Sequence, residues 1–164
     1  MANTQRTAQR ADEILMGKPG YFKLKTDKKK KNTRPSKGYF KLFAEEKKNI
    51  LVAFAKKNKT VYSKAYDLVR TKSKIDFSDI HDIERKIEDI TFIEVKGTVE
   101  DLDAKFTNHF FGVTVEEMRM AQEHIEQYRF VFVNVKHNYK LEMNLHGFFS
   151  RIRKLYPTFS VRFN

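Results

Sequence analysis

The stretch ITFIEVKGT, residues 90–98, is the part of the chain that decides its fold. Three of its first four residues are apolar, which predicts a strand buried in a sheet. Glu94 and Lys96 follow, and because alternate residues of a strand point to the same side, their side chains should project together. Burying two charges beside a central sheet costs free energy unless they bind each other or a ligand. The stretch therefore predicts either a salt-bridged strand end or a charged functional site.

The residues after this strand predict a helix and a second strand. Thr114 and Glu117 have the spacing of a capping box, which predicts that a helix begins just after Thr114. That helix leads into RFVFVNV, residues 129–135, which is rich in strand-forming residues. A helix at 145–156 and an alternating strand at 158–163 follow. This order predicts an α/β fold with a central mixed sheet flanked by helices.

Upstream of the strand, apolar residues at helical spacing predict helices at 4–17 and 43–57. Residues 61–77 fit either a helix or a strand. Residues 78–89 carry isoleucines at helical spacing, and they fit either a short helix or an irregular excursion between strands. The secondary structure of residues 61–89 therefore stays undecided.

A five-residue string, GYFKL, occurs at 20–24 and again at 38–42, on either side of the basic stretch TDKKKKNTRPSK. It is either a pair of aromatic strand segments around a basic loop or a coincidence in a chain rich in Lys and Phe. We assign residues 1–42 to a basic N-terminal helix and loop extension, and residues 43–164 to one folded domain.

The composition excludes several classes of protein. A hydrophobic content of 40% in 164 residues is enough to build a core, but no apolar run approaches the roughly 20 residues of a membrane-spanning helix. The first residues lack the apolar segment of a secretory signal. The absence of cysteine excludes disulfides and thiolate metal sites. We therefore expect a cytoplasmic protein with no membrane partner.

The charge of the chain is concentrated in its first half. Residues 1–75 hold 21 Lys and Arg against 6 Asp and Glu, whereas residues 76–164 hold 12 against 15. A one-sided excess repels itself unless a polyanion meets it, and nucleic acid is the commonest such partner. We predict that double-stranded DNA binds this half. The predicted contact residues are Lys28, Lys29, Lys30, Lys31, Arg34, Lys37, Arg70, Lys72 and Lys74.

The pattern of an acidic residue, any residue and a lysine occurs six times, so the pattern alone selects nothing. Only Glu94 and Lys96 stand at the end of an apolar strand. Such a strand, preceded by an acidic residue and followed by a helix and a strand, resembles the PD-(D/E)xK nuclease superfamily. FIEVKGT, an FF-containing segment, a Thr-capped helix and FVFVNV also resemble the restriction-endonuclease-like domain at the C-terminus of NO VEIN-type proteins. The resemblance covers about residues 75–135.

The resemblance implies a metal site. In this superfamily two carboxylates and one main-chain carbonyl hold a divalent ion, and the lysine helps to position and activate the attacking water. Glu94 and the carbonyl of Val95 would then be ligands, and Lys96 the activating residue. Asp76 is the favoured second carboxylate because it follows a strand-like segment, and Asp79 is the alternative.

The residue types favour one class of metal. Oxygen ligands with retained water suit Mg²⁺, with Mn²⁺ as a substitute, rather than zinc. No two histidines have the spacing of a helical zinc site. Glu45 or Glu46 is either an extra acid at the site or part of an exposed helix N-terminus.

Three functions remain open on the sequence. The first is a Mg²⁺-dependent endodeoxyribonuclease of restriction-enzyme type that acts as a homodimer, because cutting both strands needs two sites and the chain offers one. The second is a non-catalytic module of the same fold that binds DNA or RNA. The third is a structural basic protein in which Glu94 and Lys96 form a surface pair.

Overall fold

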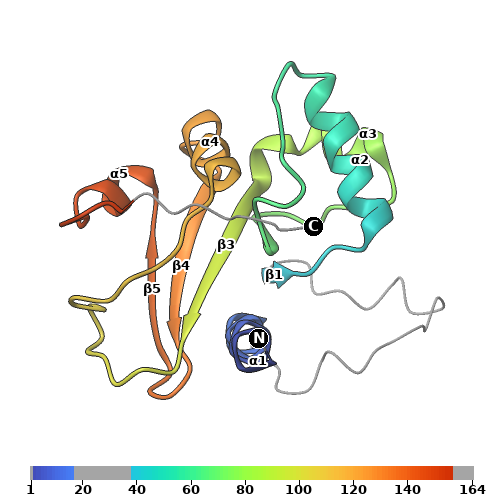
Figure 1. The fold of residues 1–164 in the computed structure, drawn as a ribbon. Coiled ribbons are helices and arrows are strands. Elements are labelled where there is room, and N and C mark those ends of the chain that lie inside the picture. The colour runs from blue at the N-terminus through green and yellow to red at the C-terminus, as the bar shows by residue number, and fades with distance from the viewer. Residues whose placement is uncertain (1, 17–37, 157–164) are drawn as a thin grey trace, which may run out of the picture.

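The structure is a computed structural model that describes residues 2–16 and 38–156 (Figure 1). Five strands form one sheet in the order β1-β2-β3-β4-β5. They are β1 (Gly38–Phe40), β2 (Leu68–Thr71), β3 (Ile90–Thr98), β4 (Tyr128–Asn134) and β5 (Tyr139–Met143). The helices are α1 (Ala2–Met16), α2 (Ala44–Ala55), α3 (Ile80–Arg85), α4 (Val115–Glu123) and α5 (Leu145–Phe149), with a 3-10 turn, η2 (Ile87–Asp89), before β3.

The sheet is mixed. β3 and β4 run parallel and are joined through α4, whereas the other neighbouring pairs are antiparallel. This confirms the α/β prediction of a mixed sheet flanked by helices, and the arrangement is compatible with a restriction-endonuclease-like fold. Among the described residues, none of the helices combines the length and the apolarity that crossing a bilayer requires.

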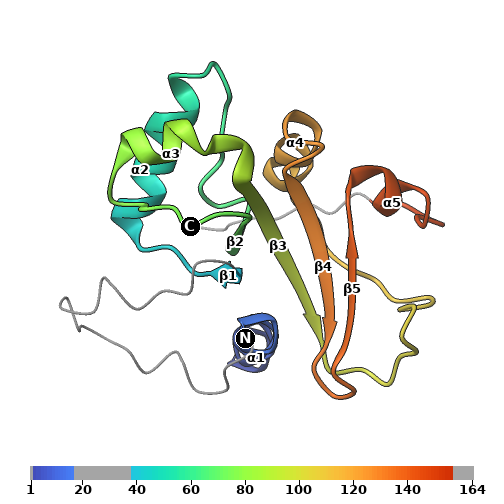
Figure 2. The same ribbon diagram turned by 180° about the vertical axis from the view of Figure 1, so that it is seen from behind.

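Strand β3 is the centre of the sheet, and its two sets of alternate residues enter different cores. Phe92 belongs to the larger core, which α2, α3, α4 and α5 cover. Ile93 and Val95 belong to a smaller core on the opposite face, which α1 covers with Ala11 and Leu15. Figures 1 and 2 show α1 apart from the other helices, beside β3. Glu94 and Lys96 share the parity of Phe92, so they face the helical layer opposite α1.

The described parts of the predicted N-terminal extension, residues 2–16 and 38–42, contribute to the folded unit. β1 is the edge strand of the sheet and pairs with β2, and α1 packs against β3. The second GYFKL copy therefore begins in a strand. The first copy, the basic stretch between the copies and the strand predicted at 158–163 lie outside the described residues.

Two elements at the C-terminal side differ from the sequence prediction. The helix expected at 145–156 ends at Phe149, because Arg151 and Ile152 donate to carbonyls only three residues back and the α-helical ladder stops. β5 was not predicted. It is a partly exposed edge strand that pairs only with β4, so its sequence, YKLEM, has little hydrophobic signal.

Gly97 permits α1 to approach β3 closely. A Cβ added at Gly97 would lie 3.0 Å from the Ala11 Cβ and 3.3 Å from the Thr7 carbonyl oxygen. We expect Gly97→Ala to lower the free energy of unfolding by about 1–3 kcal/mol, because the contact forces α1 outward. Chemical denaturation measures the change. Gly112→Ala is the matched control, because no atom lies within 4 Å of its added Cβ. Equal stability of the two variants would contradict the packing described for α1.

Candidate active site

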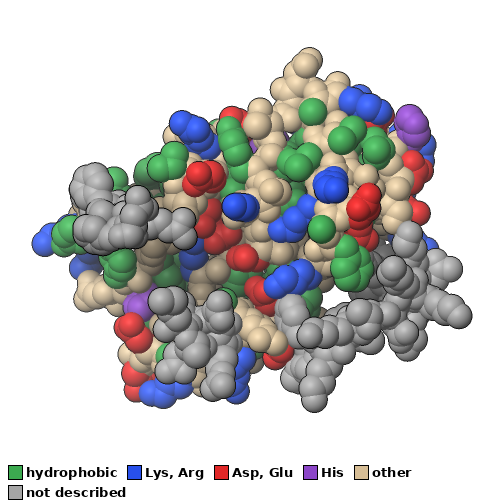
Figure 3. Space-filling model, turned by 45° about the vertical axis from the view of Figure 1, so that its right-hand side comes forward, with side chains coloured by type: hydrophobic (Ala, Val, Ile, Leu, Met, Phe, Trp, Pro, Cys, Tyr) green, Lys and Arg blue, Asp and Glu red, His purple; other side chains and the backbone are tan. Residues whose placement is uncertain are grey.

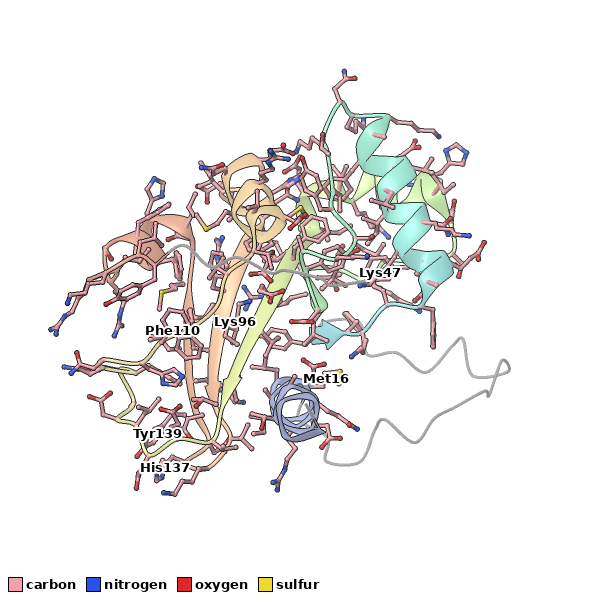
Figure 4. The ribbon with its side chains drawn as sticks, in the orientation of Figure 1. Met16, Lys47, Lys96, Phe110, His137 and Tyr139 are labelled. Carbon is pink, nitrogen blue, oxygen red and sulfur yellow. The ribbon has the colours of Figure 1, made fainter. Side chains whose placement is uncertain are left out.

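Glu94, Lys96 and Glu117 form a buried cluster in which one ammonium lies between two carboxylates. The Lys96 Nζ lies 2.7 Å from the Glu94 Oε1 and 2.8 Å from the Glu117 Oε2. The three side chains are 14%, 8% and 7% exposed in the order Lys96, Glu94, Glu117. Figure 4 shows Lys96 on β3 in the middle of the molecule. The predicted pair is therefore buried, and it has a third member that the sequence analysis did not assign to the site.

Glu117 reaches the cluster from the first turn of α4. The Thr114 Oγ1 accepts the Glu117 amide at 3.2 Å, and the Glu117 Oε2 accepts the Thr114 amide at 3.1 Å, which completes the predicted capping box. The same Oε2 binds Lys96. The capping signature in the sequence located this residue, but only the packing of α4 beside β3 shows that it faces Lys96.

Asp67 is the acidic residue that the structure brings to Glu94. It lies one residue before β2, and the register of β2 on β3 continues from the pair Leu68 and Ile93 to Asp67 and Glu94. The Asp67 amide donates to the Ile93 carbonyl at 2.9 Å, and the Asp67 Oδ2 accepts the Val95 amide at 2.9 Å. These two bonds attach Asp67 to β3 on either side of Glu94.

The main chain of Val95 faces Asp67 as well. In a strand the amide and carbonyl of one residue point to the same neighbour. The Val95 amide points to Asp67, so its carbonyl is directed to that side of β3 as well. β2 pairs with β3 only as far as Ile93, so no residue of β2 lies opposite Val95. Two carboxylates and one carbonyl therefore converge where β2 begins.

Asp76 and Asp79 are not brought to Glu94. The Asp79 side chain caps α3 by accepting the His81 amide at 2.9 Å, and the Asp76 Oδ1 accepts the Ser78 amide at 2.9 Å. Both lie on the connection that leaves β2 beside Ile90, at the far end of the strand pair. In an antiparallel pair the residue that meets the end of β3 must precede β2. That geometry selects Asp67 in place of the two aspartates predicted from the sequence.

The backbone before Asp67 is held by three contacts. The Lys47 Nζ, from α2, donates to the Ser63 carbonyl at 3.1 Å and lies 4.6 Å from the centroid of the Tyr66 ring. The Tyr128 hydroxyl donates to the Ala65 carbonyl at 2.6 Å. These contacts fix the approach to Asp67, and Figure 4 shows Lys47 at the end of α2 nearest the sheet.

Helix α2 contributes the Lys47 ammonium to the surroundings of Asp67, whereas Glu45 and Glu46 do not face the cluster. The Glu46 Oε2 accepts the Phe43 amide at 2.8 Å, and Glu45 is exposed. Lys47 is half-buried, and burial lowers its pKa below the usual value despite the attraction of Asp67 and Glu94. Neither Glu45 nor Glu46 therefore supplies an extra acid to the site. The residue of α2 that lies near Asp67 and Glu94 is Lys47.

The cluster holds more buried carboxylate than its lysines balance. Burial, with the repulsion of Asp67 and Glu117, raises the pKa of Glu94 to about 9 against the attraction of Lys96. Burial lowers the pKa of Lys96, but the two glutamates outweigh it and leave that pKa above its usual value. The ionised form of Glu94 is therefore costly in this cluster, and a further cation beside it would offset that cost.

The pKa of Glu94 gives a testable pH dependence of stability. A carboxyl whose pKa is raised from 4.5 to about 9 on folding destabilises the folded state progressively as pH rises through that window. We expect Glu94→Gln, which cannot ionise, to gain stability relative to metal-free wild type between those pH values. Thermal unfolding with chelator at several pH values measures the difference. A difference that does not change with pH would contradict the burial of the carboxylate.

The predicted DNA-contacting residues lie in three situations. Arg70 is engaged by Glu142 through two bonds, at 2.7 and 2.8 Å. Lys72 and Lys74 are exposed on the connection after β2. Lys28, Lys29, Lys30, Lys31, Arg34 and Lys37 lie outside the described residues. Arg70 is thus tied to β5 through Glu142, and DNA contact by all of these residues stays a prediction.

Comparison with known proteins gives one match. The family described as Protein NO VEIN, C-terminal, matches residues 37–143, which is more than half of the chain. The chain belongs to this family. The comparison with curated proteins and the comparison with solved structures found no match. Asp67, Glu94, Lys96 and Glu117 all fall inside the part that corresponds to the NO VEIN C-terminal domain, which also contains β1 to β5.

Proposed function

We propose that the chain is a divalent-metal-dependent endonuclease that hydrolyses phosphodiester bonds of DNA. The observation that carries the proposal is the convergence of Asp67, Glu94 and the Val95 main chain beside Lys96. Two carboxylates and a carbonyl can hold a divalent ion, and an adjacent ammonium can stabilise charge on a phosphate, which together suit metal-assisted phosphodiester hydrolysis.

The donor set fits Mg²⁺, with Mn²⁺ as a substitute. In the described ranges no three acidic or histidine side chains are grouped closely enough to hold a metal ion by themselves. Mg²⁺ typically takes only one or two protein carboxylates and keeps water for the rest of its shell. Asp67, Glu94 and the Val95 carbonyl would hold it, and the burial that raises the pKa of Glu94 supports the addition of a cation beside this carboxyl. The bound ion would polarise the phosphate and acidify a water.

The side chains around these ligands act on the substrate phosphate. Lys96, kept charged by its two glutamates, stabilises negative charge that develops on the phosphate and orients the attacking water. Lys47 adds positive potential on the α2 side and holds the main chain before Asp67. Figure 3 shows acidic and basic side chains interspersed over the middle of one face of the molecule.

The partner and assembly follow from the charge and from the single site. The net charge of +12 favours a polyanion, and we assign double-stranded DNA to this role. One chain provides one site, so cleavage of both strands needs two copies, and we propose a homodimer. Sedimentation of the protein with and without a short duplex measures its stoichiometry.

A plasmid assay tests the proposed activity. Supercoiled plasmid incubated with purified protein should be converted to nicked and linear forms with Mg²⁺ or Mn²⁺ and should stay intact with chelator. Retention of plasmid without cleavage under either metal, with affinity that falls steeply as salt rises, would instead support the non-catalytic binding module. Cleavage that persists in chelator would contradict the metal requirement.

A further inference from the structure

We propose that Glu117 is a positioning residue for Lys96, and that the capping box of α4 therefore also belongs to the site. This inference rests on the proposed function, because it assigns Lys96 a role in phosphodiester hydrolysis. One carboxylate oxygen, the Glu117 Oε2, accepts both the Thr114 amide at 3.1 Å and the Lys96 ammonium at 2.8 Å. The start of α4 thus fixes the point in space at which the ammonium is held.

Lys96 needs such an anchor because its side chain is long and flexible. A lysine side chain loses rotamer entropy when it is fixed, and its ammonium can hydrogen-bond in many directions. Glu94 and Glu117 take two of its three N–H donors in the described part of the chain. The third N–H stays available for a water or a phosphate oxygen.

Two carboxylates are needed because Glu94 serves two partners. In the proposed site Glu94 is also a metal ligand, so its hold on Lys96 weakens when a divalent ion draws on the same carboxylate. Glu117 belongs to α4 and not to the proposed metal ligands, and its side chain is buried. It can therefore keep Lys96 in place while Glu94 binds the ion. Loss of Glu117 should disturb the chemical step and leave DNA binding unchanged.

The test compares Glu117→Gln with Asn144→Ala, which removes the cap of α5. Gln also satisfies a capping box, so Glu117→Gln should keep the unfolding temperature near that of wild type. Its kcat should fall by about 10–100-fold with KM unchanged, the scale of losing a partner that orients a site group. Asn144 accepts the Gly147 amide at 2.9 Å at the start of α5, outside the elements that carry Lys96 and Glu117. Asn144→Ala should lower the unfolding temperature and keep kcat.

A second readout does not depend on cleavage. Acetylation of lysines, followed by mass spectrometry, should show that Lys96 is protected in wild type. In Glu117→Gln the rate of Lys96 acetylation should rise about tenfold, which is the scale of one lost charge-assisted hydrogen bond. The exposed Lys72 and Lys74 provide internal references. If wild type does not cut DNA but Lys96 becomes reactive in the variant, the proposed function fails and the positioning stands. If wild type cuts and Glu117→Gln keeps both its kcat and its Lys96 protection, the positioning role is overturned.

Discussion

Replacement of Asp67 by Asn is expected to abolish Mg²⁺-dependent cleavage, with kcat/KM falling by about 10³-fold or more. The variant loses the charge of one of the two carboxylates that converge beside Val95. Its amide oxygen can still accept the Val95 amide, which Asp67 now holds at 2.9 Å, so the junction of β2 and β3 should persist. Initial rates of plasmid nicking at several Mg²⁺ concentrations, with thermal unfolding measured alongside, give the two quantities.

The matched controls are Asp76→Asn and Asp79→Asn. Asp79 caps α3 and Asp76 accepts the Ser78 amide. Both hydrogen bonds are local to the segment between β2 and α3. Asn is as good as Asp at a helix N-cap. Both variants should therefore cut DNA at the wild-type rate. Loss of cleavage in Asp79→Asn, with activity retained in Asp67→Asn, would show that Asp79 is the second metal-binding carboxylate and would contradict the assignment of Asp67.

Replacement of Lys96 by Met should lower both the cleavage rate and the free energy of unfolding. The Glu94 and Glu117 carboxyls would lose the ammonium that lies 2.7 and 2.8 Å from them. Removing one partner of a buried ionic cluster costs about 3–5 kcal/mol, and we also expect kcat to fall by about 10²–10³-fold through lost charge stabilisation. Urea denaturation with chelator, and cleavage assays with Mg²⁺, measure the two effects.

Two further variants separate the effects of Lys96. Lys48 is exposed on α2, so Lys48→Met should change neither stability nor cleavage. Adding Glu117→Gln to Lys96→Met removes one of the two unpaired carboxylates, so the double variant should regain part of the lost stability while it stays inactive. The stability change of the double variant should differ from the sum of the two single changes by more than the about 0.5 kcal/mol found for independent sites. Additive stability changes would show that the two side chains do not interact.

The part of the fold around β3 was predictable because its signals are local. The apolar run at 90–98 and the strand-prone run beginning at 129 gave β3 and β4 almost to their observed ends. The Thr and Glu spacing gave the start of α4. Glu94 and Lys96 were identified for the same reason, because strand alternation alone places their side chains together.

Asp67 and Glu117 were missed because their roles depend on contacts between distant segments. β2 has only four residues in a stretch that fits helix or strand equally, so its direction and register could not be read from its residues. Asp67 stands 27 positions before Glu94, at the opposite end of β2 from the connection that holds Asp76 and Asp79. An acidic residue directly before the apolar pair Leu68 and Val69 is the sequence signal that would have indicated it.

We propose that Asp67, Glu94 and the Val95 carbonyl hold one divalent ion beside Lys96. Crystals of the protein grown with Mn²⁺, with data collected to record its anomalous scattering, test it directly. The site described here predicts one anomalous peak bonded to both carboxylates and to that carbonyl, at about 2.0–2.2 Å, and no such peak in Asp67→Asn. A Mn²⁺ ion bound elsewhere on the chain, with Asp67 and Glu94 holding only water, would contradict it.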